Sequence, residues 1–225
     1  MRMLLNRLFP DLCVLSDKPL SERCDHLTCS HCWAAMPEII PVCPACQRQT
    51  PLPHICPRMP GKGIVLAPYL HDGCIRHLVH RLKYHHDLRA GTTLAALVAH
   101  TVPWAYQQDL RPEALCPVPL SYRAHVRRGF NQAAWLAAAL GRRLQVPMMA
   151  RHVTRQHGPR QVTRSRAERL ALPASVFRIK RQPVWRHVAI IDDVYTTGAT
   201  TRALTRALRR AGVARVDVWC ATRAQ

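Results

Sequence analysis

The sequence predicts an α/β protein built on a parallel β-sheet, and three observations support this. In residues 61–225, short apolar runs of strand length alternate with longer stretches of helical periodicity. One apolar run ends in two adjacent aspartates and a short loop of hydroxyl residues and glycine, which is where open α/β sheets bind ligands. The 225 residues also suffice for one ordinary domain with a stable core and a small additional module.

The expected strands and helices alternate along the chain. Apolar runs predict strands at Gly63–Leu70, Leu115–Val118, His187–Ile191 and Val213–Cys220. Helical patterns predict helices at Gly73–Tyr84, Leu88–His100, Asn131–Leu144 and Thr200–Ala211. The first helix has an apolar stripe formed by Ile75, Leu78, Val79 and Leu82. Strands separated by helices indicate a parallel sheet whose faces are covered by helices.

The chain divides near residue 60 into a module at 1–60 and a domain at 61–225. Residues 1–60 hold seven of the ten cysteines and a net charge of +1, from six basic and five acidic residues. Residues 61–225 hold 27 basic and eight acidic residues, a net charge of +19. Both properties change around Pro57–Gly61, which is typical of a linker.

Composition excludes several classes of protein. With 48% hydrophobic residues the chain is not a disordered tail. It has no apolar run of the roughly 18–20 residues that a membrane-spanning helix needs. The first ten residues contain Arg2 and Arg7 and lack the apolar core of a signal peptide. We therefore expect a cytoplasmic protein whose cysteines are reduced thiols or metal ligands.

The sharpest motif is the segment Val188–Thr201. An apolar strand leads to Asp192 and Asp193, a short loop follows, and an amphipathic helix then begins. Amides in the loop and the positive end of the helix dipole can bind one anion, and Gly198 permits close approach of the backbone. Carboxylates beside such a loop can accept hydrogen bonds from sugar hydroxyls and stabilise positive charge developing on the ring. A phosphorylated sugar matches both groups.

This segment resembles the phosphoribosyl pyrophosphate (PRPP) fingerprint of type I phosphoribosyltransferases. The resemblance implies that Asp192 and Asp193 hold the ribose and act as the catalytic pair. It also implies that the 5′-phosphate is bound by Thr196, Thr197, Gly198, Ala199 and Thr200. The alternative is a buried strand whose aspartates merely cap a helix.

A pyrophosphate leaving group calls for Mg²⁺ and for donors from elsewhere in the fold. The strand at Leu115–Val118 ends where such a loop would lie. The candidates for the pyrophosphate and flap region are Lys83, Leu120, Ser121, Arg123, Arg127 and Arg128. For any single arginine, the simpler interpretation is a solvated surface charge.

Together these motifs resemble the ComF family of competence-associated, phosphoribosyltransferase-like proteins. The resemblance includes the cysteine-rich start, Leu82–Tyr84, Val118–Leu120 and Arg128–Gln132. It continues through residues 161–169 and Phe177 to the Asp192–Thr200 loop. Arg164 and Leu172 depart from the family's usual leucine and asparagine, in a segment expected to form a flap over the site. The resemblance implies a role in DNA uptake, natural transformation or use of external DNA.

The cysteines predict a zinc-ribbon module with at least one zinc ion. Whether the module binds one ion or two is left open by the sequence. Cys29/Cys32 and Cys43/Cys46 form two C-x2-C pairs, the spacing that presents two thiolates to one tetrahedral zinc. The family pattern implies a double ribbon, from which this chain lacks two thiolates, at Ser16 and Met59. One zinc could be bound by those two pairs together. Two zincs would use Cys13, Cys29, Cys32 with Cys24 or His26, and Cys43, Cys46, Cys56 with His54.

Positive charge points to a polyanionic partner. Residues 122–187 hold fifteen basic residues and one acid, Glu168, and 29 of the chain's 33 basic residues are arginine. Arginine binds phosphates bidentately and stacks on bases, which favours single-stranded DNA as a partner. If the protein is an adaptor, a DNA-processing helicase or another uptake protein is a further expected partner. Two other functions remain open: a non-catalytic adaptor that senses PRPP, and a base-salvage phosphoribosyltransferase.

Overall fold

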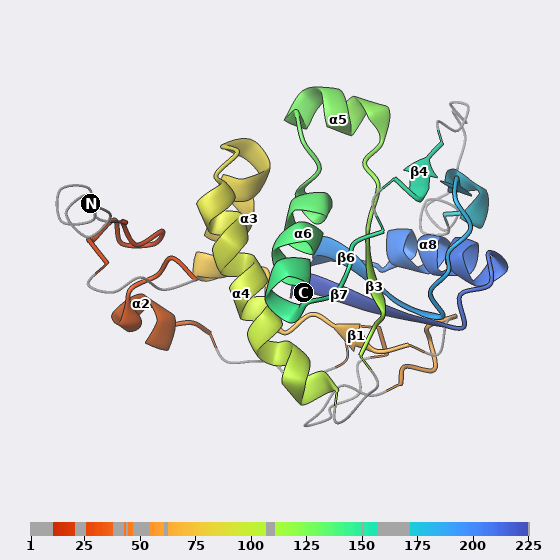
Figure 1. The fold of residues 1–225 in the computed structure, drawn as a ribbon. Helices are drawn as coiled ribbons and strands as arrows, with labels where there is room; N and C mark the ends of the chain where they lie inside the picture. The colour runs from red at the N-terminus through yellow and green to blue at the C-terminus, as the bar shows by residue number, and fades with distance from the viewer. Residues whose placement is uncertain are drawn as a thin grey trace.

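The predicted α/β architecture is confirmed by a computed structural model of the chain. The structure describes residues 11–20, 26–37, 43, 45–46, 55–60, 63–106, 111–149, 151–156 and 172–224, without the side chains of Trp104, Arg123 and Arg127. A parallel sheet lies between two layers of helices (Figure 1). None of the helices in these ranges is long and apolar enough to span a bilayer.

The central sheet of the described residues has five strands, all paired in parallel. They are β1 (Val65–Leu66), β2 (Tyr69–Leu70), β3 (Ala114–Pro117), β6 (His187–Tyr195) and β7 (Arg215–Arg223). Their order is β1-β7-β6-β3, and β2 continues the edge by pairing with the end of β7. The strand expected over Gly63–Leu70 is thus two short strands, interrupted at Ala67 and Pro68, because proline has no amide hydrogen to donate.

The long helices cover both faces of the sheet. Helices α3 (Gly73–Tyr84), α4 (Leu88–Ala105) and α6 (Gln132–Leu144) lie on one face and α8 (Ala199–Arg210) on the other (Figure 1). The bounds of α3 are those predicted, and its four apolar residues are buried. Helix α4 runs five residues beyond the predicted end, through Pro103, and the Tyr106 amide closes its last turn on the Val102 carbonyl.

Five short elements of the described residues are not among those predicted from the sequence. Helix α5 (Tyr122–Arg128) follows β3 and stands above the sheet in Figure 1, and α2 (Ser30–Ala34) belongs to the cysteine-rich segment. Strands β4 (Val153–Arg155) and β5 (Phe177–Ile179) pair antiparallel in a separate two-stranded sheet, preceded at β5 by the 3-10 turn Ala174–Val176.

Alternating side chains of the strands divide the core into two halves. Leu115, Ile191 and Trp219 point toward α3, α4 and α6. Ile190 and Val218 point toward α8. Cys116 and Cys220 are fully buried in this second half, which confirms that they are core thiols.

A buried carboxylate joins the elements near the amino ends of β6 and β7. Asp217 is completely buried and accepts hydrogen bonds from the Ile64 amide (2.8 Å) and the Tyr106 hydroxyl (2.6 Å). It also pairs with His187 Nε2 (2.7 Å) and Arg215 Nε (3.2 Å). These partners satisfy a charge that would otherwise be costly to bury.

Candidate functional site

Strand β6 carries the two predicted carboxylates to the carboxyl edge of the sheet. It extends to Tyr195, four residues beyond the predicted end, so Asp192 and Asp193 belong to the strand itself. The Lys83 ammonium, near the end of α3, lies 3.1 Å from the Asp193 carboxylate. Both side chains are largely buried, at 17% and 11% exposed. The structure thus brings Lys83, a candidate that the sequence named for the phosphates, next to Asp193.

Asp192 is held in an environment that disfavours its charge. Withdrawal from solvent and the neighbouring Asp193 carboxylate raise the pKa of Asp192 to about 7. The Asp193 amide, which donates to Asp192 Oδ1 at 2.9 Å, lowers this pKa, as do Lys83 and Arg155. Arg155 lies on β4, so a strand that the sequence did not predict contributes a cation to the site. A carboxyl near its pKa at neutral pH is typical of functional sites.

The predicted phosphate loop leads directly into α8. Gly198 is the N-cap residue of α8 and has φ +70°, a backbone conformation that favours glycine. Thr196 and Thr197 are exposed, whereas Ala199 and Thr200 are half-buried. The loop is held by the Thr201 hydroxyl, which donates to the Gly198 carbonyl at 3.0 Å. This geometry presents the first amides of a three-turn helix at the carboxyl edge of the sheet.

Two side chains that the sequence analysis missed support this loop. Arg202 donates to the Thr197 carbonyl at 2.7 Å. The Tyr195 ring lies against Gly198, where an added Cβ would be 2.7 Å from the ring carbon that bears the hydroxyl. Arg202 could have been found from its helical spacing of four residues after Gly198. No sequence signal places the Tyr195 ring.

The candidates after β3 are only partly described. Leu120 and Ser121 are half-buried, and Ser121 caps α5 by accepting from the Ala124 amide at 3.3 Å. The side chains of Arg123 and Arg127 lie outside the described atoms. Arg128 donates to the Gln132 side chain at 3.4 Å.

The Arg128–Gln132 segment connects α5 to α6. Gly129 ends α5 in the left-handed conformation, and the Asn131 side chain caps α6. The same side chain donates to the Val118 carbonyl at 3.0 Å, which ties the start of α6 to the end of β3. Phe130 packs edge-on against His86, just after α3. The segment therefore joins the carboxyl ends of β3 and α3.

Six cysteines form two clusters of three. Cys13, Cys29 and Cys32 make the first triad and Cys43, Cys46 and Cys56 the second, with the sulfurs of each within 4.8 Å of one another. The predicted pairs Cys29/Cys32 and Cys43/Cys46 thus belong to different clusters rather than to one four-cysteine site. Cys24 and His54, the predicted additional ligands, lie outside the described residues. The His26 ring instead stacks on Trp33 at 4.0 Å.

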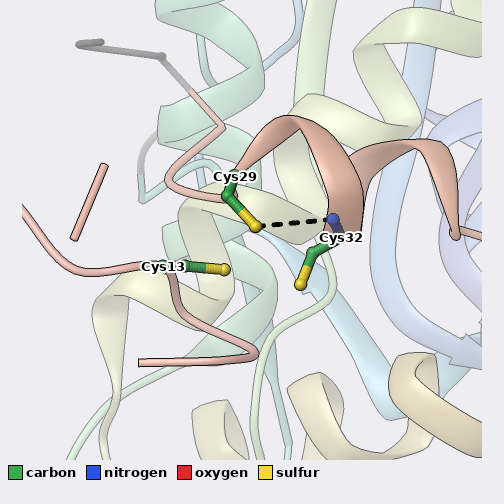
Figure 2. A group of neighbouring side chains, drawn as sticks. All are labelled: Cys13, Cys29 and Cys32. Carbon is green, nitrogen blue, oxygen red and sulfur yellow. Dashed lines mark hydrogen bonds between the residues drawn. The ribbon is translucent and has the colours of Figure 1, made fainter. Parts of the chain in front are cut away.

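The first triad lies at the start of α2, and its three sulfurs point into a common space (Figure 2). Cys29 is the N-cap of α2 and its sulfur accepts from the Cys32 amide at 3.5 Å. Burial raises the pKa of Cys13, but hydrogen bonds from Ser16 and nearby backbone amides outweigh it and bring the pKa to about 6. The cysteine-rich segment contacts α4, because the Thr93 hydroxyl donates to the His26 carbonyl at 2.6 Å.

The second triad packs against the α8 side of the sheet. Cys43 and Cys56 are buried in the same core half as Ile190 and Val218. The Cys56 amide donates to the Gly63 carbonyl at 3.0 Å, two residues before β1. Burial, together with the other two thiols, raises the pKa of Cys56 to about 12.

Both triads fit a tetrahedral zinc site. Zinc–sulfur bonds of about 2.3 Å place neighbouring sulfurs roughly 3.8 Å apart, which the spacing within each triad allows. Three thiolates would leave one position for a fourth ligand. Each triad combines a C-x2-C pair with one cysteine distant in sequence, an arrangement typical of structural zinc.

The fold and these sites define a parallel α/β protein with two adjacent carboxylates at the carboxyl edge of its sheet and two cysteine triads. The chain is 31% identical to "Competence protein F" of Haemophilus influenzae, over 87% of this chain and 84% of the relative. It is 32% identical to "DNA utilization protein YhgH" of Escherichia coli K12, over 95% of this chain and 97% of the relative. This identity and coverage place the chain in the ComF family. "Competence protein ComFC" of Bacillus subtilis is 26% identical over 90% of each chain. No family model matches the chain.

Proposed function

We propose that this protein binds PRPP as a phosphoribosyltransferase-type protein and acts in competence or DNA utilisation. The relatives' names, competence protein and DNA utilization protein, support the role. The observation that carries PRPP binding is the juxtaposition of Asp192 and Asp193 with the loop before α8 at one sheet edge. That edge offers acceptors for ribose hydroxyls and donors for a phosphate.

The two carboxylates would have unequal roles. Asp193 is paired with the Lys83 ammonium, which lies 3.1 Å from its carboxylate. Asp192 has a pKa of about 7, so the approach of a cationic sugar ring would favour its ionised form. In the proposed reaction, a nucleophile displaces pyrophosphate at ribose C1 and the carboxylates stabilise the developing positive charge. We assign the leaving pyrophosphate to Lys83, because its ammonium lies next to the Asp193 carboxylate.

Asp192 and Asp193 would hold a Mg²⁺ ion, which would supply neutralisation of the pyrophosphate charge. Mg²⁺ prefers carboxylate and phosphate oxygens and keeps several waters, which matches the chemistry of Asp192 and Asp193. Its requirement is measured by titrating PRPP binding in the presence and absence of the ion.

Zinc is the proposed occupant of both triads. A cysteine-rich segment with little core of its own gains folding free energy from a structural metal. Elemental analysis of protein purified without chelator should give about two zinc ions per chain. Less than half an equivalent would contradict the proposal.

Single-stranded DNA is the proposed macromolecular partner. The excess of arginine over acids in residues 122–187 supports binding to a polyanion. Affinity for an oligonucleotide should therefore fall steeply between low and moderate salt. Affinity that is independent of salt would contradict this part of the proposal.

A non-catalytic adaptor is the second candidate function. The two triads and the basic segment 122–187 suit a protein that binds DNA or a helicase partner, with PRPP reporting nucleotide status. Base salvage is less well supported, because a free base needs neither a cysteine module nor a basic segment.

Pyrophosphate release from Mg·PRPP distinguishes these functions. Free bases, ammonia or glutamine, and single-stranded DNA are offered in parallel, with the Asp192→Asn/Asp193→Asn variant as control. Release that depends on one acceptor identifies the transferase and its substrate class. Tight PRPP binding without release under any condition identifies the adaptor. A double variant that binds PRPP as tightly as the wild type contradicts the assigned site.

A further inference from the structure

Tyr195 lies between the phosphate loop and the second cysteine triad. It ends β6 and is 3% exposed. On one side its ring fills the space that a side chain at Gly198 would need. On the other side it belongs to the same buried cluster as Cys43 and Cys56.

Electrostatics also indicate that the thiols and Tyr195 are neighbours. Burial raises the pKa of Tyr195 to about 12, and the nearby Cys220, Cys43 and Cys56 thiols act in the same direction. The Tyr195 hydroxyl is buried and has no hydrogen-bond partner within the described part of the chain. Its position therefore depends on packing from both sides rather than on a fixed polar contact.

The backbone joins the two sites as well. Tyr195 pairs with Arg223 in the β6–β7 register, and its carbonyl accepts from the Ala224 amide at 2.9 Å. Burial lowers the pKa of Arg223, which is 9% exposed, and the nearby Cys43 thiol opposes this by favouring the charged guanidinium. A buried guanidinium beside a cysteine cluster suits a metal–thiolate group with excess negative charge.

We infer that metal binding at the second triad and phosphate binding at Thr196–Thr200 are coupled through Tyr195. This inference rests on the proposed PRPP site. A metal fixes Cys43, Cys46 and Cys56 in one arrangement and so fixes the thiol side of the core half that contains the Tyr195 ring. Without the metal these thiols can move, and the ring then has room to move away from Gly198. Tyr195 is a positioning residue here, because it acts on the loop rather than on the ligand.

The first triad provides a matched control, because it packs elsewhere. Its segment contacts α3 and α4: the Arg81 guanidinium donates to the Val14 carbonyl, and Thr93 to that of His26. Val14 belongs to the core half on the opposite face of the sheet from Tyr195. Metal loss there should leave the phosphate loop unchanged.

The test compares Cys46→Ser with Cys29→Ser, each changing one half-buried cysteine of a triad. Calorimetry measures binding of ribose 5-phosphate, which probes the phosphate loop without a pyrophosphate group. Cys46→Ser should weaken this binding at least about fivefold, the lower end of typical coupling between sites, and Cys29→Ser by less than about twofold. Equal effects of the two substitutions, or none, would overturn the inference.

Two further measurements do not depend on the stability of Cys46→Ser. Coupling is reciprocal, so saturating ribose 5-phosphate should slow zinc transfer to a chromogenic chelator from the Cys29→Ser protein. Tyr195→Phe should retain this effect because the ring remains, whereas Tyr195→Ala should abolish it. A wild-type chain that binds neither ribose 5-phosphate nor PRPP refutes the proposed function. One that binds them without any effect on zinc release refutes only the coupling.

Discussion

Replacing Asp192 with asparagine should stabilise the ligand-free protein while removing the proposed ribose site. The pKa of Asp192 is about 7 against an ordinary value of 3.8, so ionising this carboxyl disfavours the folded state. A shift of about 3 units corresponds to a ceiling of about 4 kcal/mol. Sharing of charge with Asp193 and access of water reduce this ceiling. We therefore expect Asp192→Asn to raise the free energy of unfolding by about 1–2 kcal/mol at pH 8.

The sign follows from the proton held by each state. Between pH 4 and pH 7 the folded chain keeps a proton on Asp192 that the unfolded chain has lost, so wild-type stability falls as pH rises through this window. The advantage of Asp192→Asn should therefore be small near pH 4 and complete above pH 7. The asparagine carbonyl can still accept from the Asp193 amide, now 2.9 Å from the carboxylate.

Thermal unfolding at several pH values measures this effect. For a chain of this size about 1–2 kcal/mol corresponds to a Tm increase of about 4 °C. Asp193→Asn is the control, and it should destabilise the protein because it leaves the largely buried Lys83 ammonium without its carboxylate. An Asp192→Asn variant with wild-type stability at pH 8, or with a gain that is the same at pH 5, would refute the reasoning.

Three other substitutions test separate parts of the structure. Lys83→Met removes a cation that lowers the pKa of Asp192, so the pH midpoint of PRPP binding should move upward; an unchanged midpoint contradicts the ion pair's role. Gly198→Ala should cost about 1–3 kcal/mol in urea denaturation, and more than Gly73→Ala, which also has positive φ but has no atom near the new Cβ. Asp217→Asn should cost about 2–4 kcal/mol because it weakens four buried contacts; a change under about 0.5 kcal/mol argues against the network.

Much of the fold could be predicted from local patterns in the sequence. The apolar stripe of Gly73–Tyr84 repeats at helical spacing, and both ends of that helix are as expected. The strand before Asp192 is a continuous apolar run, typical of a strand buried on both faces. Because parallel strands end at one edge, the position of the carboxylates followed directly from this assignment.

The missed elements depend on interactions that local patterns do not contain. Helix α5 is short and rich in arginine, so it has no apolar stripe, although Ser121 and Gly129 supply recognisable end signals. Strands β4 and β5 are each three residues long and are stabilised by pairing with each other across the chain.

The contacts within the site were harder to predict than its location. Lys83 and Asp193 are 110 positions apart in the sequence, and only the folded chain, which brings the end of α3 close to the end of β6, makes them a pair. The grouping of the cysteines was left open by their spacing, because one site and two sites fit it equally well. The structure favours two triads, since Cys13 and Cys56 each join a different C-x2-C pair.

The Asp217 network has a consequence for how the chain folds. Its hydrogen bonds join residues separated by 153, 111, 30 and 2 positions, so most of them close long loops. Long loops are entropically costly to close before other contacts form, which favours late assembly of this junction. Interactions that form after the transition state govern the unfolding rate rather than the folding rate. The Asp217 carboxylate, at the edge opposite the proposed ligand site, would then mainly slow unfolding and so set the lifetime of the folded protein.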